Sequence, residues 1–233
     1  MQRICPNNPV VLIHVMKTAG LSVQSAIGTA IGDKYCCKTY NESRIAGEQV
    51  KKIASAMDLK ATHFYTGHFQ FDDINALCAE RSIKPFYISF VREPYQRIRS
   101  LRTYLAGQPN DPLHNIAITG DINSFFDALI KVNEGLVSNT CFKAISDRHG
   151  SSDTIVNVAS NMDFLGTLDQ FGEFEYYMEK RFGMDLDIRH LNRSERRFTS
   201  PLLEAESDKI LDMNEKDSLI YDFLIKNGPI MRF

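Results

Sequence analysis

The stretch VVLIHVMKTAGLS, residues 10–22, decides the fold. Residues 10–15 form an almost continuously apolar, β-branched run, which is typical of a strand buried on both faces of a parallel sheet. The polar turn at residues 17–20 contains a glycine, and the uncharged segment at residues 22–31 then predicts a centrally packed helix. A buried strand that leads through such a turn into a helix is the repeating unit of an α/β fold.

The rest of the chain continues this alternation of strands and helices. We expect strands at residues 61–66, 86–91 and 163–166, helices at residues 41–57, 71–81, 94–106, 124–132, 136–145 and 171–182, and a loop at residues 108–121. The charged tail, about residues 201–233, is predicted to be helical and to pack on the outside. Together these elements predict one domain over residues 1–233, an α/β sandwich of three layers with a mainly parallel central sheet flanked by helices.

Composition restricts the partners and the compartment. The 27 Lys and Arg residues nearly balance the 29 Asp and Glu residues, which argues against binding to nucleic acid through bulk charge. No stretch approaches the ~20 apolar residues of a transmembrane helix, and no secretory signal is evident. Five cysteines without a CxxC pair favour reduced thiols. We therefore expect a cytoplasmic protein without a transmembrane segment or a nucleic-acid partner.

The turn after the first strand has the features of an anion site. Its backbone N–H groups, the positive end of a helix dipole and Lys17 would converge on one point, which suits a phosphate or a sulfate. The hydroxyls of Thr18 and Ser22 could add donors, and Gly20 lets the backbone approach the anion. The turn is not a Walker A motif, because Met16 stands where that motif requires glycine. A plain loop with a surface lysine and a capping serine is the structural alternative.

A second strand-to-helix junction begins at Arg92. This residue follows the strand at residues 86–91, and open α/β sheets bind ligands at the carboxyl ends of their strands. Its guanidinium offers a bidentate fork for an anion. Ser100 lies about two helical turns further on and can reach the same phosphate only if the helix axis runs past it. A solvated, basic helix start containing Arg97 and Arg99 is the structural alternative.

Taken in order, the two junctions resemble the cofactor motifs of sulfotransferases that use 3′-phosphoadenosine-5′-phosphosulfate (PAPS). The pattern HxxKTAGxS followed by FVREPxxRxxS is similar to HIPKTGGTS and FLRDPxxRxxS of the carbohydrate-type branch, which includes the uronyl and heparan 2-O-sulfotransferases. Weaker similarities at residues 66–69, 139–143, 163–166 and 190–192 extend the resemblance over residues 9–195. Met16 and Leu21 depart from the family pattern, and Leu21 removes one hydroxyl donor, so we expect weaker or differently shaped cofactor binding.

The resemblance implies a role for each matching residue. The 5′-phosphosulfate would be held by Lys17, Thr18, Ala19, Gly20, Leu21 and Ser22, and the 3′-phosphate by Arg92 and Ser100. Lys17 would also stabilise the leaving phosphate in an in-line displacement that needs no metal and leaves PAP, adenosine 3′,5′-bisphosphate, as product. His68 is the candidate base for the acceptor hydroxyl, because a neutral imidazole accepts a proton near pH 7. The implied activity is sulfuryl transfer from PAPS to a carbohydrate or glycoconjugate.

Other residues and two other functions compete with this interpretation. His190 is the strongest rival base, whereas His14 is expected to be structural and to support the first turn. A basic cluster could contact phosphate or an anionic acceptor, or lie in a solvated loop: Arg193, Arg196 and Arg197. A P-loop kinase-like phosphotransferase is disfavoured by the missing Walker glycine and by the lack of an obvious Mg²⁺-holding aspartate. A non-catalytic nucleotide-binding module would explain the residues at positions 16 and 21.

Overall fold

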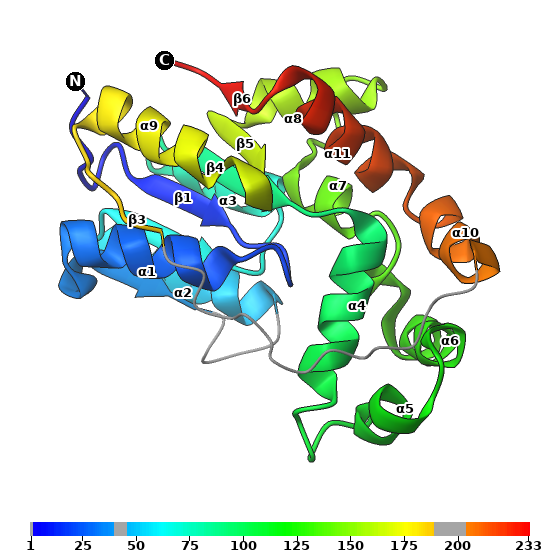
Figure 1. The fold of residues 1–233 in the computed structure, drawn as a ribbon. Helices are drawn as coiled ribbons and strands as arrows, with labels where there is room; N and C mark the ends of the chain where they lie inside the picture. The colour runs from blue at the N-terminus through cyan, green and yellow to red at the C-terminus, as the bar shows by residue number, and fades with distance from the viewer. Residues whose placement is uncertain (1, 40–45, 189–203) are drawn as a thin grey trace.

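The computed structural model describes residues 2–39, 46–188 and 204–233, and a six-stranded sheet lies at its centre (Figure 1). The strand order is β2-β3-β1-β4-β5-β6. The strands are β1 (Val10–Ile13), β2 (Cys36–Lys38), β3 (Phe64–Gly67), β4 (Phe86–Val91), β5 (Phe164–Thr167) and β6 (Ile230–Met231). The first five run parallel, and β6 pairs antiparallel with β5. The expected α/β class with a mainly parallel sheet is therefore confirmed.

Each face of the sheet is buried under its own group of helices. Side chains alternate along a strand, so Val11 and Ile13 join one core cluster while Val10 and Leu12 join another. The first cluster is covered by α2 (Ala46–Asp58), α3 (Phe71–Glu80), α7 (Thr140–Ile145), α8 (Thr154–Asn161) and α11 (Glu215–Asn227). The second is covered by α1 (Gly20–Ile31) and α9 (Phe171–Phe182). Burial on both faces explains why the strands are apolar throughout.

A group of helices beside the sheet forms a third core cluster. In Figure 1, α4 (Pro94–Leu105) runs away from the sheet toward α5 (His114–Thr119) and α6 (Ile122–Asn133). The helix α10 (Glu204–Asp212) contributes Ile210 to the same cluster. The expected loop at residues 108–121 is thus wrong in part. Its turn-forming residues flank α5, and the fully buried Ala117 anchors that helix.

Several shorter elements differ from the prediction. The strands β2 and β6 and the helix α8 were not predicted, and β3 begins three residues later than expected. The expected helix at residues 136–145 begins only at Thr140, after the 3-10 turn η2 (Glu134–Leu136). Two further 3-10 turns in the described residues are η1 (Asp33–Tyr35) and η3 (Leu168–Gln170). The part of the expected helix at residues 41–45 lies outside the described residues. Very short strands and short helices such as the eight-residue α8 carry too little periodicity to be recognised in a sequence.

The tail is helical as predicted, but its outer position is wrong. Ile220 and Leu224 of α11 lie one turn apart and are almost completely buried in the core against the sheet. The strand β6 then adds the final residues of the chain to the sheet edge. Charged residues on the outer face of α11 hid this narrow apolar stripe in the sequence.

Two findings bear on the environment of the protein. None of the helices within the described ranges has the length and apolar character needed to cross a bilayer. All five cysteines lie within these ranges and form no disulfide.

Candidate functional site

The carboxyl ends of three neighbouring strands meet at one edge of the sheet. Ile13 of β1 is in register with Gly67 of β3 on one side and with Ser89 of β4 on the other. After β1 the chain passes to α1 on one face of the sheet, whereas after β3 it passes to α3 on the opposite face. Such a divergence opens a crevice at the strand ends, which is where open α/β sheets bind ligands.

The turn that follows β1 is shaped to receive an anion. Lys17 and Ala19 have φ angles of 70° and 59°, while Thr18 between them does not have a positive φ. Alternation of this kind directs successive backbone N–H groups into one concavity. Within the described part of the chain, the N–H groups of residues 18–21 have no hydrogen-bond acceptor. The Thr18 hydroxyl, predicted to face the ligand, instead donates to the carbonyl of Val15 at 2.8 Å and fixes the turn.

Position 20 must be a glycine, because the ring of His14 leaves no room for a Cβ atom there. A Cβ atom at Gly20 would lie 2.0 Å from Cδ2 of His14, far inside van der Waals distance. His14 follows β1 directly and is only 8 % exposed. Burial, with smaller contributions from His68 and Lys17, lowers the pKa of His14 to about 3, so the ring is neutral at pH 7. The structure thus gives His14 the predicted supporting position beneath the first turn.

His68 is held in one tautomer by the backbone of His14. Its Nδ1 lies 2.5 Å from the carbonyl oxygen of His14, and the two rings are 4.6 Å apart. Since a carbonyl oxygen only accepts, Nδ1 carries the proton and Nε2 is left as the acceptor. Burial lowers the pKa of His68, although the bond to His14 opposes this shift. The half-buried imidazole is therefore neutral at pH 7 and can accept a proton at Nε2.

Gln49 supports His68 from α2 and was not predicted. Its Oε1 accepts from the backbone N–H of His68 at 2.7 Å and from the Thr39 hydroxyl at 3.0 Å. Gln49 is almost completely buried. A polar residue on the apolar face of an amphipathic helix was the only sequence signal for this role.

Lys17 and Arg92 lie side by side. Arg92 Nη1 donates to the carbonyl oxygen of Lys17 at 3.4 Å, and the ammonium of Lys17 lies 4.5 Å from the ring centre of Tyr104 on α4. Burial, together with the nearby charge of Arg92, lowers the pKa of Lys17. In the described ranges neither cation forms a salt bridge with a carboxylate. Two adjacent, half-buried cations without such a partner favour the binding of an anion.

The residues after Arg92 serve the structure of α4. Glu93 caps the helix, because its carboxylate accepts from the backbone N–H groups of residues 95 and 96 at 2.8 and 2.7 Å. Arg97 is 1 % exposed and donates to the hydroxyl of Thr140 at 3.0 Å, so it does not belong to a solvated helix start. Ser100 is half-buried and lies one turn before Tyr104 on the same face of α4, the face that contacts Lys17. A contact between Ser100 and a phosphate stays a prediction.

Asp217 on α11 lies close enough to Arg97 to interact with it electrostatically. This buried carboxylate accepts from the backbone N–H groups of Cys141 and Phe142 at 3.0 and 2.8 Å and so caps α7. Burial raises the pKa of Asp217, and Arg97 and the two N–H groups oppose that shift. The tail thereby supports the helix that packs behind Arg92.

The side chains of the other predicted residues take no described part in this site. Leu21 is 39 % exposed on the first turn of α1. The rival base and the basic cluster lie outside the described residues: His190, Arg193, Arg196 and Arg197. In the described ranges, no group of three or more His, Cys, Asp or Glu residues could hold a metal ion.

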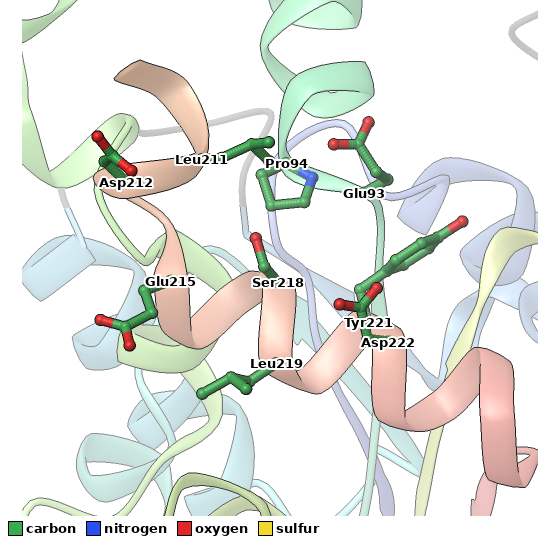
Figure 2. A pocket seen from close by; sticks show the side chains of 9 residues that line it. All are labelled: Glu93, Pro94, Leu211, Asp212, Glu215, Ser218, Leu219, Tyr221 and Asp222. Carbon is green, nitrogen blue, oxygen red and sulfur yellow. The ribbon is translucent and has the colours of Figure 1, made fainter. Parts of the chain in front are cut away.

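A pocket of about 500 Å³ lies beside the start of α4, and Figure 2 shows its lining. Its walls come from Glu93 and Pro94 at the start of α4, from α10 and from α11. Four carboxylates line it: Glu93, Asp212, Glu215 and Asp222. Because they would repel a phosphate, we do not assign this pocket to an anionic ligand.

No protein-family model matches the chain, and no curated protein matches it significantly.

Proposed function

We propose that the protein is a PAPS-dependent sulfotransferase with a P-loop-like fold, acting on a hydroxyl of a carbohydrate or glycoconjugate. The juxtaposition of Lys17 and Arg92 carries this proposal. Their charges stand together above a turn whose backbone N–H groups lack acceptors in the described part of the chain. Several anions would fit such a site. The two junctions resemble sulfotransferase motifs, and this resemblance favours a nucleotide with an anionic group at each end.

In this proposal the turn and the α4 junction bind the two ends of the nucleotide. The N–H groups of residues 18–21 and the Lys17 ammonium would hold the 5′ end, and Arg92 with Ser100 would hold the 3′-phosphate. Thr18 acts only through its backbone, because its hydroxyl proton is donated within the turn. Leu21 also contributes its backbone alone, so its departure from the family pattern leaves the N–H donor in place.

Lys17 and His68 then act on the two ends of the transfer, the leaving group and the proton of the acceptor hydroxyl. PAPS, when bound, supplies a sulfuryl group on a phosphate leaving group, and such transfers develop negative charge on the leaving oxygen. The Lys17 ammonium stabilises charge that develops in the transition state, which raises the rate rather than only tightening binding. His68 Nε2 accepts the hydroxyl proton, while the His14 carbonyl keeps the proton of the resting imidazole on Nδ1.

A thermal-shift experiment tests the choice of nucleotide. Adenosine 3′,5′-bisphosphate should raise the melting temperature, because a ligand at 100 times its Kd adds about 2.7 kcal/mol of stability. The variant Arg92→Ala should abolish the shift, whereas Arg148→Ala should not, because Arg148 pairs with Asp72 on the surface. Stabilisation by ATP-Mg²⁺ alone would contradict the proposal and favour a phosphotransferase.

Turnover tests the catalytic roles. We expect Lys17→Ala and His68→Ala to lose most of the release of PAP from PAPS over a panel of sugar acceptors, with nucleotide affinity falling mainly in Lys17→Ala. His63→Ala is the matched control, because this ring stacks on Tyr35 at 4.7 Å and precedes β3, whereas His68 follows it. Full activity in His68→Ala would remove it as the base and would direct attention to His190.

A further inference from the structure

Tyr104 covers the ammonium of Lys17 from the side of α4. Tyr104 is 41 % exposed, and the Lys17 Nζ lies 4.5 Å from the centre of its ring. That separation is within the range in which an aromatic face attracts a cation. Tyr104 lies twelve residues after Arg92, so neither resemblance nor spacing singled it out in the sequence.

The segment from Arg92 to Tyr104 contacts both the backbone and the charged end of Lys17. Arg92 holds its carbonyl oxygen at the start of that segment, and Tyr104 holds its ammonium near the end of α4. Its backbone adopts a φ of 70°, a conformation that a residue with a side chain rarely takes. Without Tyr104 the flexible four-carbon side chain would lose its one described contact at the charged end.

An aromatic ring orients the ammonium without neutralising it. A carboxylate in the same place would form an ion pair and compete with an incoming anion, whereas a ring attracts the cation and leaves its full positive charge. Among the described residues, the site therefore combines an ordered lysine with a positive charge that no carboxylate pairs with. This is the arrangement that preorganised binding of an anion requires.

We propose that Tyr104 is a positioning residue that orients Lys17 toward the nucleotide, an inference that rests on the proposed function. The ring acts through Lys17 and does not itself contact the reacting atoms. Its hydroxyl is not needed for this role, so phenylalanine should replace it while leucine should not.

A double-mutant cycle between the two residues tests the proposal. We expect Tyr104→Leu to weaken binding of adenosine 3′,5′-bisphosphate or to lower kcat by about 2- to 30-fold, the range of a cation–π contact. Tyr104→Phe should stay within about twofold of the parent protein. In a Lys17→Met background, Tyr104→Leu should have no further effect. Tyr176→Leu is the matched control, because Tyr176 makes a similar contact with Lys180 on α9.

Urea unfolding without ligand separates this inference from the proposed function. It compares the four proteins of the cycle: the parent, Tyr104→Leu, Lys17→Met and the variant with both substitutions. Non-additive shifts of the urea midpoint are expected, because each substitution alone already breaks the contact. Additive midpoint shifts, or an equal loss of binding by Tyr104→Leu in both backgrounds, would overturn the positioning role and leave the proposed function intact. Failure of the parent protein to bind the bisphosphate would overturn both.

Discussion

Replacing Gly20 by alanine places a methyl group inside the ring of His14. The new Cβ would lie 2.0, 2.3 and 2.5 Å from three ring atoms, compared with about 3.5–4.0 Å for an ordinary carbon contact. The ring is 8 % exposed and lies against His68, so it has little room to move. In a helix, alanine normally stabilises the folded protein by up to about 1 kcal/mol relative to glycine. Overpacking of a filled core costs about 1–3 kcal/mol or more, and we expect a net destabilisation of that order.

Urea unfolding of Gly20→Ala beside Gly172→Ala measures this effect. A Cβ at Gly172, in the first turn of α9, would meet nothing within 4 Å, so this control should be neutral or slightly stabilised. Adding His14→Ala to Gly20→Ala should remove the clash and make the two substitutions strongly non-additive. Equal stability of Gly20→Ala and Gly172→Ala would refute the claimed packing of His14 under the turn.

Three further outcomes follow from polar groups that support the fold. The pKa of His14 is lowered in the folded state, so the unfolded chain binds a proton first as the pH falls. The free energy of unfolding should therefore decrease below pH 6.5, by up to about 1.4 kcal/mol per pH unit toward pH 3. His14→Phe should reduce this slope in urea titrations at several pH values. Asp217→Ala should cost about 1–3 kcal/mol, because it leaves the two backbone N–H groups at the start of α7 without their acceptor. Asp222→Ala on the exposed face of α11 should change stability by less than about 0.5 kcal/mol in the same assay. Glu93→Ala should lower the unfolding free energy by about 0.5–2 kcal/mol through loss of the α4 cap, and an unchanged urea midpoint would contradict that capping role.

The strands of the central sheet could be predicted because burial on both faces makes each of them a continuous apolar run. The same pattern located Lys17 and Arg92, since each lies within a few residues of the end of such a run. Neighbouring strand ends were then expected at one edge of the sheet, and the bond between these two residues agrees with that expectation.

The supporting residues could not be predicted, because their partners are distant in the sequence. Asp217 contacts backbone groups 75 and 76 residues before it, and Gln49 contacts His68 across 19 residues. Arg97 was ambiguous for the same reason: a basic residue early in a helix can face water or a buried carboxylate, and only the packing of α11 decides. The contact between Tyr104 and Lys17 likewise depends on the direction in which α4 leaves the sheet.

The separation in sequence between α7 and its capping carboxylate, Asp217, has a consequence for biosynthesis. The ribosome completes residue 142 some 75 residues before it adds Asp217, a delay of roughly 4–15 s at ordinary elongation rates. During that interval the first N–H groups of α7 have no acceptor from α11. The nascent protein therefore cannot complete the capping of α7 before α11 has been translated, and the proposed nucleotide site should mature only after α11 has emerged and docked.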